Sequence, residues 1–266
     1  LHFWHDRNSF AFVIVWRPDV TAAAEFIGVV KTYKSGPFAR NGTQAVQGVT
    51  LSVPVGSVFA LLGPNRAGKT TLVKTLLSLT RPTAGTVSRL GEPTANRATL
   101  ARVGYMHENH AFPRYLSPAE VLGFYGGLSG IPAEGLRPKV DALLEKVGLD
   151  DRRRDQIGRF SKGMVQRLGL AQAIINDPDL LILDEPTEGL DLAGRILLRQ
   201  VVRKLKAAGK TVLVVSHVLP EIEELCDRVA VVVGGRLAFQ GTMGELTHGN
   251  PLEPALAAVY QKGAAA

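Results

Sequence analysis

The sequence has 266 residues, 45% of them hydrophobic and 21% charged, which suits one large globular α/β domain with or without an inserted subdomain. Its single cysteine excludes an internal disulfide framework, and its longest apolar runs are far too short to cross a bilayer. The net charge of +7 suggests binding to nucleic acid or to an anionic membrane, but the basic residues are scattered, so a solvated surface is the better interpretation.

The two ends of the chain carry no recognisable motif. Residues 1–19 contain two Trp and several Phe without helical or strand periodicity, and no methionine precedes Met106. We therefore expect residues 1–24 to be an N-terminal extension that is disordered or a translation artefact. The main domain is expected at residues 25–245, and a C-terminal tail at 246–266.

The first part of the domain contains a phosphate-binding motif. Strands are expected at 26–30, 46–53 and 58–62, with a polar, Gly-rich loop at 35–44. The third strand leads into Gly63-Pro64-Asn65-Arg66-Ala67-Gly68-Lys69-Thr70, and residues 71–79 have an amphipathic helical pattern. This segment fits G-x-x-x-x-G-K-[ST], in which backbone N–H groups and a helix N-terminus bind phosphate oxygens. An ordinary glycine-containing turn is the alternative, but the flanking strand and helix favour a nucleotide site.

The middle of the chain has a helical pattern. After short strands expected at 86–90 and 103–106, Ser117-Pro118-Ala119-Glu120 forms a capping box with proline at the first helical position. The helical pattern runs to about residue 175, with breaks at 130–132 and 148–160. Because strand-rich regions lie on both sides of it, we expect an inserted helical subdomain at about 109–176.

Alternating strands and helices return in the last third of the chain. Strands are expected at 180–184 and 211–216, and helices at 192–208 and 220–226. Gly234-Gly235 separates two apolar runs and indicates a hairpin. The fold class we predict is therefore α/β: a P-loop NTPase core with a mostly parallel sheet, an antiparallel β edge and an inserted α-helical subdomain.

Further motifs accompany the phosphate loop in a fixed order. The strand at 180–184 ends in Asp184 and Glu185, which would lie near a Mg²⁺ ion and an attacking water. An acidic pair after an apolar strand is a weak signal by itself. It gains weight from Phe160-Ser161-Lys162-Gly163-Met164 upstream, and from Gly189-Leu190-Asp191 and Ser216-His217 downstream.

Over residues 25–245 these motifs resemble the ATP-binding subunit of ABC transporters. The resemblance implies that Gly63–Thr71 is the Walker A loop, 180–184 the Walker B strand, 161–164 the signature loop and 189–191 the D-loop. It implies catalytic roles for Lys69, Glu185 and His217, and D-loop roles for Gly189, Leu190 and Asp191. The implied metal ligands are Thr70, Glu108 and Asp184. The implied nucleotide-binding residues are Tyr33, Gly63, Pro64, Asn65, Arg66, Ala67, Gly68, Lys69, Thr70, Thr71, Ser161, Lys162, Gly163 and Met164.

Several positions depart from the usual family pattern or have a second interpretation. Tyr33 falls where the family stacks an aromatic ring on adenine, but a core tyrosine is about as well supported. Lys162 and Met164 in the signature loop, with Glu108 in place of the Q-loop glutamine, resemble a branch that serves ABC-2-type exporters. Arg66 replaces a glycine, and would cost about 1–2 kcal/mol if its φ angle is positive.

The resemblance implies a peripheral ATPase on the cytoplasmic face of the membrane. This ATPase would use ATP and Mg²⁺ to power a separate transmembrane permease, and export is the favoured direction of transport. It implies a homodimer or heterodimer in which each ATP lies between one phosphate loop and the partner's Ser161 loop. Residues 112–116 would either offer exposed anchors to the permease or seal the core of the helical insertion. The alternatives are a soluble ABC ATPase that acts on nucleic acid or ribosomes, and a weakly hydrolysing regulatory subunit. No specific nucleic-acid partner is expected.

Overall fold

A six-stranded sheet forms the centre of the molecule. The computed structural model describes residues 21–34 and 42–264, and its central sheet has the strand order β10-β9-β3-β8-β7-β6. All of these strands run parallel except the edge strand β10, which pairs with β9 in an antiparallel hairpin. This confirms the predicted fold class with its antiparallel edge. The strands are β3 (Val58–Leu62), β6 (Val103–Met106), β7 (Leu180–Asp184), β8 (Thr211–Val215), β9 (Arg228–Val233) and β10 (Arg236–Thr242).

A second, antiparallel sheet covers one face of the first. Its order is β2-β1-β4-β5, and it shares a buried cluster with helix α1 (Lys69–Leu76) and with one face of the central strands. The sequence predicted the strands that correspond to β1, β2 and β4, but it predicted neither β5 nor a separate sheet. The strands are β1 (Ala22–Lys34), β2 (Gly42–Pro54), β4 (Ala84–Arg89) and β5 (Glu92–Pro93).

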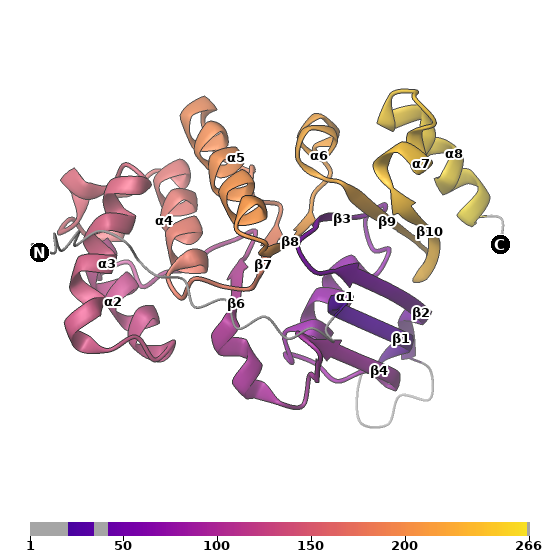
Figure 1. Cartoon of the computed structure of the whole chain (residues 1–266), viewed down its shortest axis with the longest axis horizontal. Coiled ribbons are helices and arrows are strands. Elements are labelled where there is room, and N and C mark those ends of the chain that lie inside the picture. Colours follow the sequence, from indigo (N-terminus) through magenta and orange to yellow (C-terminus); the bar gives the residue numbers. More distant parts are fainter. Residues whose placement is uncertain (1–20, 35–41, 265–266) are drawn as a thin grey trace, which may run out of the picture.

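The helices other than α1 pack on the opposite face, and three of them lie together at one end of the molecule (Figure 1). Helices α2 (Pro118–Leu128), α3 (Ala133–Lys146) and α4 (Lys162–Ile174) form that end, as the sequence predicted. Short 3₁₀ segments at 97–102, 150–152 and 157–159 connect neighbouring elements. The remaining helices are α5 (Leu192–Ala207), α6 (Leu219–Leu225), α7 (Met243–Thr247) and α8 (Leu252–Ala264). No helix within 21–34 and 42–264 combines the length and apolar character that a membrane span requires.

Both expected domain boundaries differ from the structure. Strand β1 begins at Ala22 and buries Ala23 and Ala24, so the folded domain starts before residue 25. At the other end, the expected tail is largely helix α8, which buries Leu252 and Leu256 against the main core. The predictions for residues 1–20 and 265–266, and for residues 35–41 of the loop expected at 35–44, lie outside the described residues. Residues 42–44 of that expected loop belong to strand β2.

Candidate nucleotide site

The phosphate loop follows β3, and two of its glycines are required by close backbone contacts. A Cβ at Gly63 would lie 2.1 Å from the Val232 carbonyl oxygen, and one at Gly68 would lie 2.5 Å from the Ala45 carbonyl oxygen. Gly68 has a φ angle of 104°, which disfavours any residue with a side chain. Strand β3 therefore delivers the loop to the carboxyl edge of the parallel sheet, where α/β folds bind ligands.

Helix α1 begins directly after this loop, and its N-terminus is suited to an anion. Gly68 is the N-cap and supplies no side-chain hydrogen bond, and the first turn has no acidic residue. The first N–H groups of a helix have no partner within the helix, and they carry the positive end of its dipole. A phosphate group bound at this position would satisfy both.

Arg66 holds a left-handed backbone conformation in the middle of the loop. Its φ angle is 67°, and its side chain is exposed. The position therefore needs the positive φ that glycine adopts easily, and arginine is strained there.

Lys69 lies inside the curve of the loop. Its ammonium group donates hydrogen bonds to the carbonyl oxygens of Gly63 at 2.5 Å and Pro64 at 3.1 Å. Burial lowers the pKa of Lys69, and the carboxylates of Glu185 and Asp184 act in the opposite direction. These charge interactions show that the end of β7, which carries both carboxylates, lies beside the phosphate loop.

Asp184 and Glu185 leave the end of β7 in different environments. Asp184 is buried and accepts a hydrogen bond from the Tyr105 hydroxyl at 3.4 Å. Burial raises the pKa of Asp184, as do the nearby charges of Glu185 and Glu108, while His107 lowers it. Glu185 has a φ angle of 48°, and its N–H donates to the Val215 carbonyl oxygen at 2.7 Å.

His217 orients Glu185 from the neighbouring strand. Its Nδ1 lies 2.8 Å from Glu185 Oε2, and its backbone N–H donates to the same oxygen at 3.3 Å. The hydrogen bond and charge of Glu185 raise the pKa of His217 above its ordinary value. Three parallel strands, β3, β7 and β8, thus bring a lysine, two carboxylates and a histidine to one edge of the sheet.

The expected metal ligands are all oxygen donors. They comprise the hydroxyl of Thr70 at the start of α1, the Asp184 carboxylate and the Glu108 carboxylate just after β6. Within residues 21–34 and 42–264, no group of three or more His, Cys, Asp and Glu side chains could hold a metal by itself. This donor set fits Mg²⁺, which binds proteins through few carboxylates and keeps waters and substrate phosphates as its other ligands.

The loop at 161–164 begins helix α4 and contacts the segment after Glu185. Ser161 is exposed and is the N-cap of α4, where its hydroxyl accepts a hydrogen bond from the Met164 N–H at 3.2 Å. A Cβ at Gly163 would lie 3.1 Å from the Gly189 carbonyl oxygen. Farther along that segment, Asp191 caps helix α5 by accepting from the Gly194 N–H at 2.8 Å. Helix α4 packs on β6 and α2, whereas α1 packs on β4 and β2.

The comparisons with known proteins agree on one family. A family model described as ABC transporter matches residues 46–188, more than half of the chain. The chain belongs to the ABC transporter family. It is 45% identical over 218 residues to an uncharacterized ABC transporter ATP-binding protein of Nostoc sp.. It is 43% identical over 198 residues to the Nod factor export ATP-binding protein I of Burkholderia orbicola.

These relatives are longer than this chain. The two alignments cover 81% and 74% of this chain and 65% of each relative. Among solved structures, one described as the ATP binding subunit of an ABC transporter has a TM-score of 0.80 at 25% identity, covering 89% of this chain and 99% of that one. A dimeric ATP-binding cassette bound to ADP and Pi has a TM-score of 0.73 at 23% identity and covers 83% and 98%. The second likeness shows the shared fold.

As in an ABC transporter ATP-binding domain, the motifs fall at the ends of the central strands, with Walker A after β3 and Walker B along β7. Tyr33 lies on β1 with its ring exposed, and the Lys31 ammonium lies 5.0 Å from the ring centroid. The ring is therefore not a core tyrosine, and the expected adenine contact stays a prediction.

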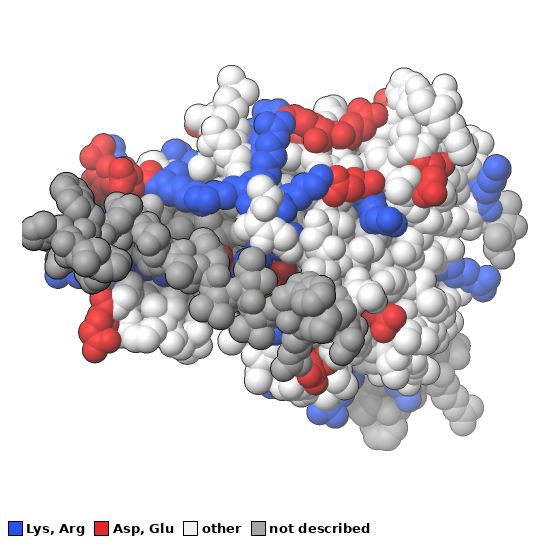
Figure 2. Space-filling view, viewed as in Figure 1, with Lys and Arg blue, Asp and Glu red and all other residues white. Residues whose placement is uncertain are grey.

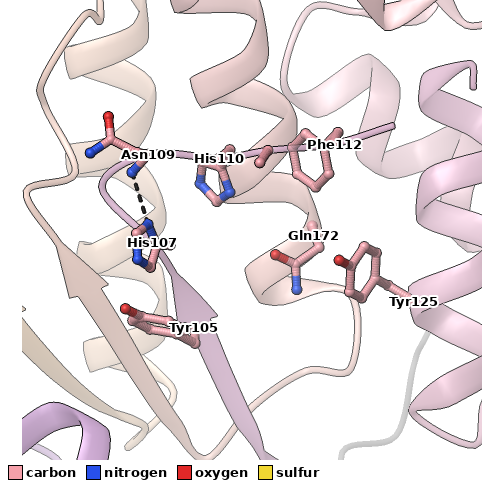
Figure 3. A pocket seen from close by; sticks show the side chains of 8 residues that line it. Tyr105, His107, Asn109, His110, Phe112, Tyr125 and Gln172 are labelled. Carbon is pink, nitrogen blue, oxygen red and sulfur yellow. Dashed lines mark hydrogen bonds between the residues drawn. The ribbon is translucent and has the colours of Figure 1, made fainter. Parts of the chain in front are cut away.

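Beside Glu108, the Q-loop region borders a cavity of about 320 Å³. Figure 3 shows this cavity between the end of strand β6 and the neighbouring helices, with His110 and Phe112 side by side. Phe112 is buried and stacks on His110 with ring centroids 5.1 Å apart, and Leu116 packs against the same core. These two residues seal the helical insertion rather than serve as exposed anchors. The cavity is lined by Tyr105, His107, Asn109, His110, Ala111, Phe112, Tyr125 and Gln172.

Sequence reasoning missed two polar groups at the site. Tyr105 donates to Asp184, and burial with the adjacent carboxylates raises its pKa beyond the ordinary range. Glu188 bonds Lys162 at 2.5 Å and interacts with His217 and Glu108. Neither residue belongs to a motif, and their roles depend on neighbours that are distant in the chain, so no local pattern marks them.

Proposed function

We propose that the chain is an ATP-hydrolysing subunit that powers a separate membrane permease, in the branch serving ABC-2-type exporters. The observation that carries this proposal is the convergence of Lys69 with the Glu185–His217 pair, joined at 2.8 Å, at the carboxyl edge of the sheet. A lysine beside a phosphate loop and a carboxylate held by histidine are the groups that hydrolysis of a phosphoanhydride requires.

Each group has a distinct role in this proposal. The Walker A N–H groups and Lys69 bind the phosphates and stabilise the charge that develops on them. Glu185 orients the attacking water, and His217 fixes the Glu185 carboxylate and contacts the γ-phosphate. Thr70, Asp184 and Glu108 would hold Mg²⁺, which supplies charge neutralisation on the phosphate oxygens. Tyr33 would contact the adenine ring.

A second ATPase subunit completes the site in this proposal. Ser161 is exposed at the start of α4, and its loop contacts Glu188 and the D-loop of its own chain. A partner's ATP could therefore reach the Ser161 loop and the N-terminus of α4 in a two-fold dimer. The solved dimeric cassette supports this arrangement only through its fold.

The permease would dock near the Q-loop and hold the subunit on the cytoplasmic face of the membrane. The Nod factor export relative, together with Glu108 and the Ser-Lys-Gly-Met signature, supports export. The nucleic-acid alternative gains no support from the surface charge. Figure 2 shows basic side chains next to acidic ones, and Arg195, Arg199 and Arg203 on α5 pair with Glu221 and Glu224 on α6.

The test of hydrolysis compares two substitutions in the purified protein. Glu185→Gln should preserve ATP binding and lower turnover by about 10²–10⁴-fold, because the amide keeps the shape of the side chain but accepts no proton. Lys69→Ala should instead weaken ATP binding, because it removes the cation from the phosphates. Binding is measured with a fluorescent ATP analogue, and turnover by phosphate release. Parental turnover in Glu185→Gln would remove that residue from the mechanism.

A further inference from the structure

An ion pair joins the signature loop to the D-loop segment within one chain. The Lys162 ammonium donates to Glu188 Oε1 at 2.5 Å. Lys162 is the residue after Ser161, and Glu188 comes directly before the D-loop glycine. The two residues are 26 positions apart in the chain, so the fold brings them together.

The backbone around this pair is packed closely. Gly189 has a φ angle of 78°, and a Cβ added to it would lie 2.7 Å from Lys162 Cδ. Gly163 is also packed closely, because a Cβ added to it would lie 3.1 Å from the Gly189 carbonyl oxygen. The aliphatic part of Lys162 therefore lies across the D-loop, and the first turn of α4 rests on it.

The other side of Glu188 faces the catalytic groups. The hydrogen bond and charge of Lys162 lower the pKa of Glu188, with a smaller contribution from the charge of His217. His217 in turn bonds Glu185 at 2.8 Å. The Glu188 N–H also donates to the Glu185 carbonyl oxygen at 3.2 Å. Hydrogen bonds therefore run from Lys162 in the signature loop through Glu188 to Glu185, the residue that would orient the attacking water.

We propose that Lys162 and Glu188 are a positioning pair that couples the signature loop to the Glu185–His217 pair of the same chain. This inference rests on the proposed ATPase dimer. When Ser161 contacts the nucleotide of one site, the shift of Lys162 moves Glu188 and adjusts Glu185 in the other site. The two ATP sites of a dimer are thereby linked through each subunit.

A purely structural role does not account for the pair. The side chains of Lys162 and Glu188 are 57% and 41% exposed, and exposed ion pairs contribute little to folding stability. Removal of the pair should therefore change activity without changing the melting temperature. The α5–α6 surface offers a matched control, because Glu224 accepts hydrogen bonds from Arg199 and Arg203 at 2.6 Å and lies outside the site.

The experiment is a double-mutant cycle on ATP turnover. Lys162→Met and Glu188→Gln should each lower the maximal rate about three- to tenfold and reduce the Hill coefficient for ATP toward one. The double variant should be no worse than the poorer single variant, because the singles break the same link. Lys162→Arg should retain most of the rate and cooperativity, since it keeps the cation. Glu224→Gln should match the wild type in both.

Other outcomes overturn the inference in distinguishable ways. If the two single effects multiply in the double variant, Lys162 and Glu188 act separately. A melting temperature that falls in parallel with the rate indicates a structural role. Wild-type turnover with a Hill coefficient of one removes the coupling but leaves the ATPase assignment intact. Absence of turnover in the wild type would instead overturn the proposed function.

Discussion

At the scale of single residues, two residues of the nucleotide site have a left-handed backbone conformation. Arg66 has a φ angle of 67° and Glu185 one of 48°. Such angles cost about 1–2 kcal/mol for a residue with a Cβ. At Glu185 the hydrogen bonds to Val215 and His217 hold the conformation and point the carboxylate out of the strand line. Strain of this kind is often found where function requires a fixed geometry.

Replacing Arg66 tests whether the strain lies in the backbone. Arg66→Gly should raise the free energy of unfolding by about 0.5–1 kcal/mol, because relief of the left-handed angle exceeds the added chain entropy of glycine. Arg66→Ala keeps the strain and should leave stability nearly unchanged. Urea denaturation measures both, and phosphate release should show faster turnover for the glycine variant. Equal effects of glycine and alanine would place the cause in the arginine side chain.

The His217–Glu185 pair predicts a pH dependence. Because Glu185 raises the pKa of His217, the ion pair contributes fully below the ordinary histidine pKa of about 6.5, and it is lost as pH rises through the folded-state value. In Glu185→Gln the His217 pKa should fall back toward 6.5. NMR titration of the His217 ring measures it directly. An unchanged pKa in the variant would mean that the two side chains do not interact in solution.

At the scale of elements, the Q-loop is fixed to helix α4 by one close contact. A Cβ at Gly169 would lie 2.0 Å from His110 Nε2, a buried atom with no hydrogen-bond partner among residues 21–34 and 42–264. Burial lowers the His110 pKa to about 4, so the ring is neutral at physiological pH. The segment after Glu108 is therefore packed directly on the helix that carries the signature loop.

A size-exchange experiment tests this contact. Gly169→Ala should destabilise the protein by about 1–3 kcal/mol, because the methyl group overlaps the imidazole. Adding His110→Ala should restore most of that loss, because the smaller side chain makes room. Thermal denaturation of the single and double variants measures the recovery. Additive losses would show that the two residues are not in contact.

The elements differ in how well the sequence predicted them. Strands Val103–Met106 and Leu180–Asp184 matched their predicted bounds, because buried parallel strands are continuous apolar runs with clear ends. The separate antiparallel sheet was not predicted, since strand pairing depends on contacts distant in sequence. Phe112 was expected to be exposed or to seal the core, and only the packing of His110 against it decides this. The Walker A, Walker B and His217 groups were predicted because fixed local motifs specify them.

At the scale of the whole molecule, the surface around the Q-loop is where a permease would dock. Tyr115 is 74% exposed beside the buried Phe112, at the junction between the sheet and the helical end. The chain has one cysteine, Cys226, which is buried, and burial raises its thiol pKa to about 12. A cysteine introduced on the surface would therefore be the only reactive thiol among the described residues.

Crosslinking in native membranes tests the docking surface. Tyr115→Cys should capture a membrane-integral protein through a thiol-reactive crosslinker, because the proposed permease contacts this junction. Leu79→Cys, 67% exposed just beyond α1, is the matched control and should capture none. Mass spectrometry identifies the product. Capture of only a second ATPase subunit at Tyr115 would argue against docking there.

The central sheet has a consequence for how this molecule unfolds. Along β3, Val58, Ala60 and Leu62 belong to the core beneath the helices, while Phe59 and Leu61 belong to the core beneath the antiparallel sheet. A strand of this kind contributes side chains to two hydrophobic cores. Unfolding of one core would therefore disrupt the strands that the other core needs. Heat should therefore disrupt both cores in one cooperative transition, so calorimetry should show a single peak rather than two.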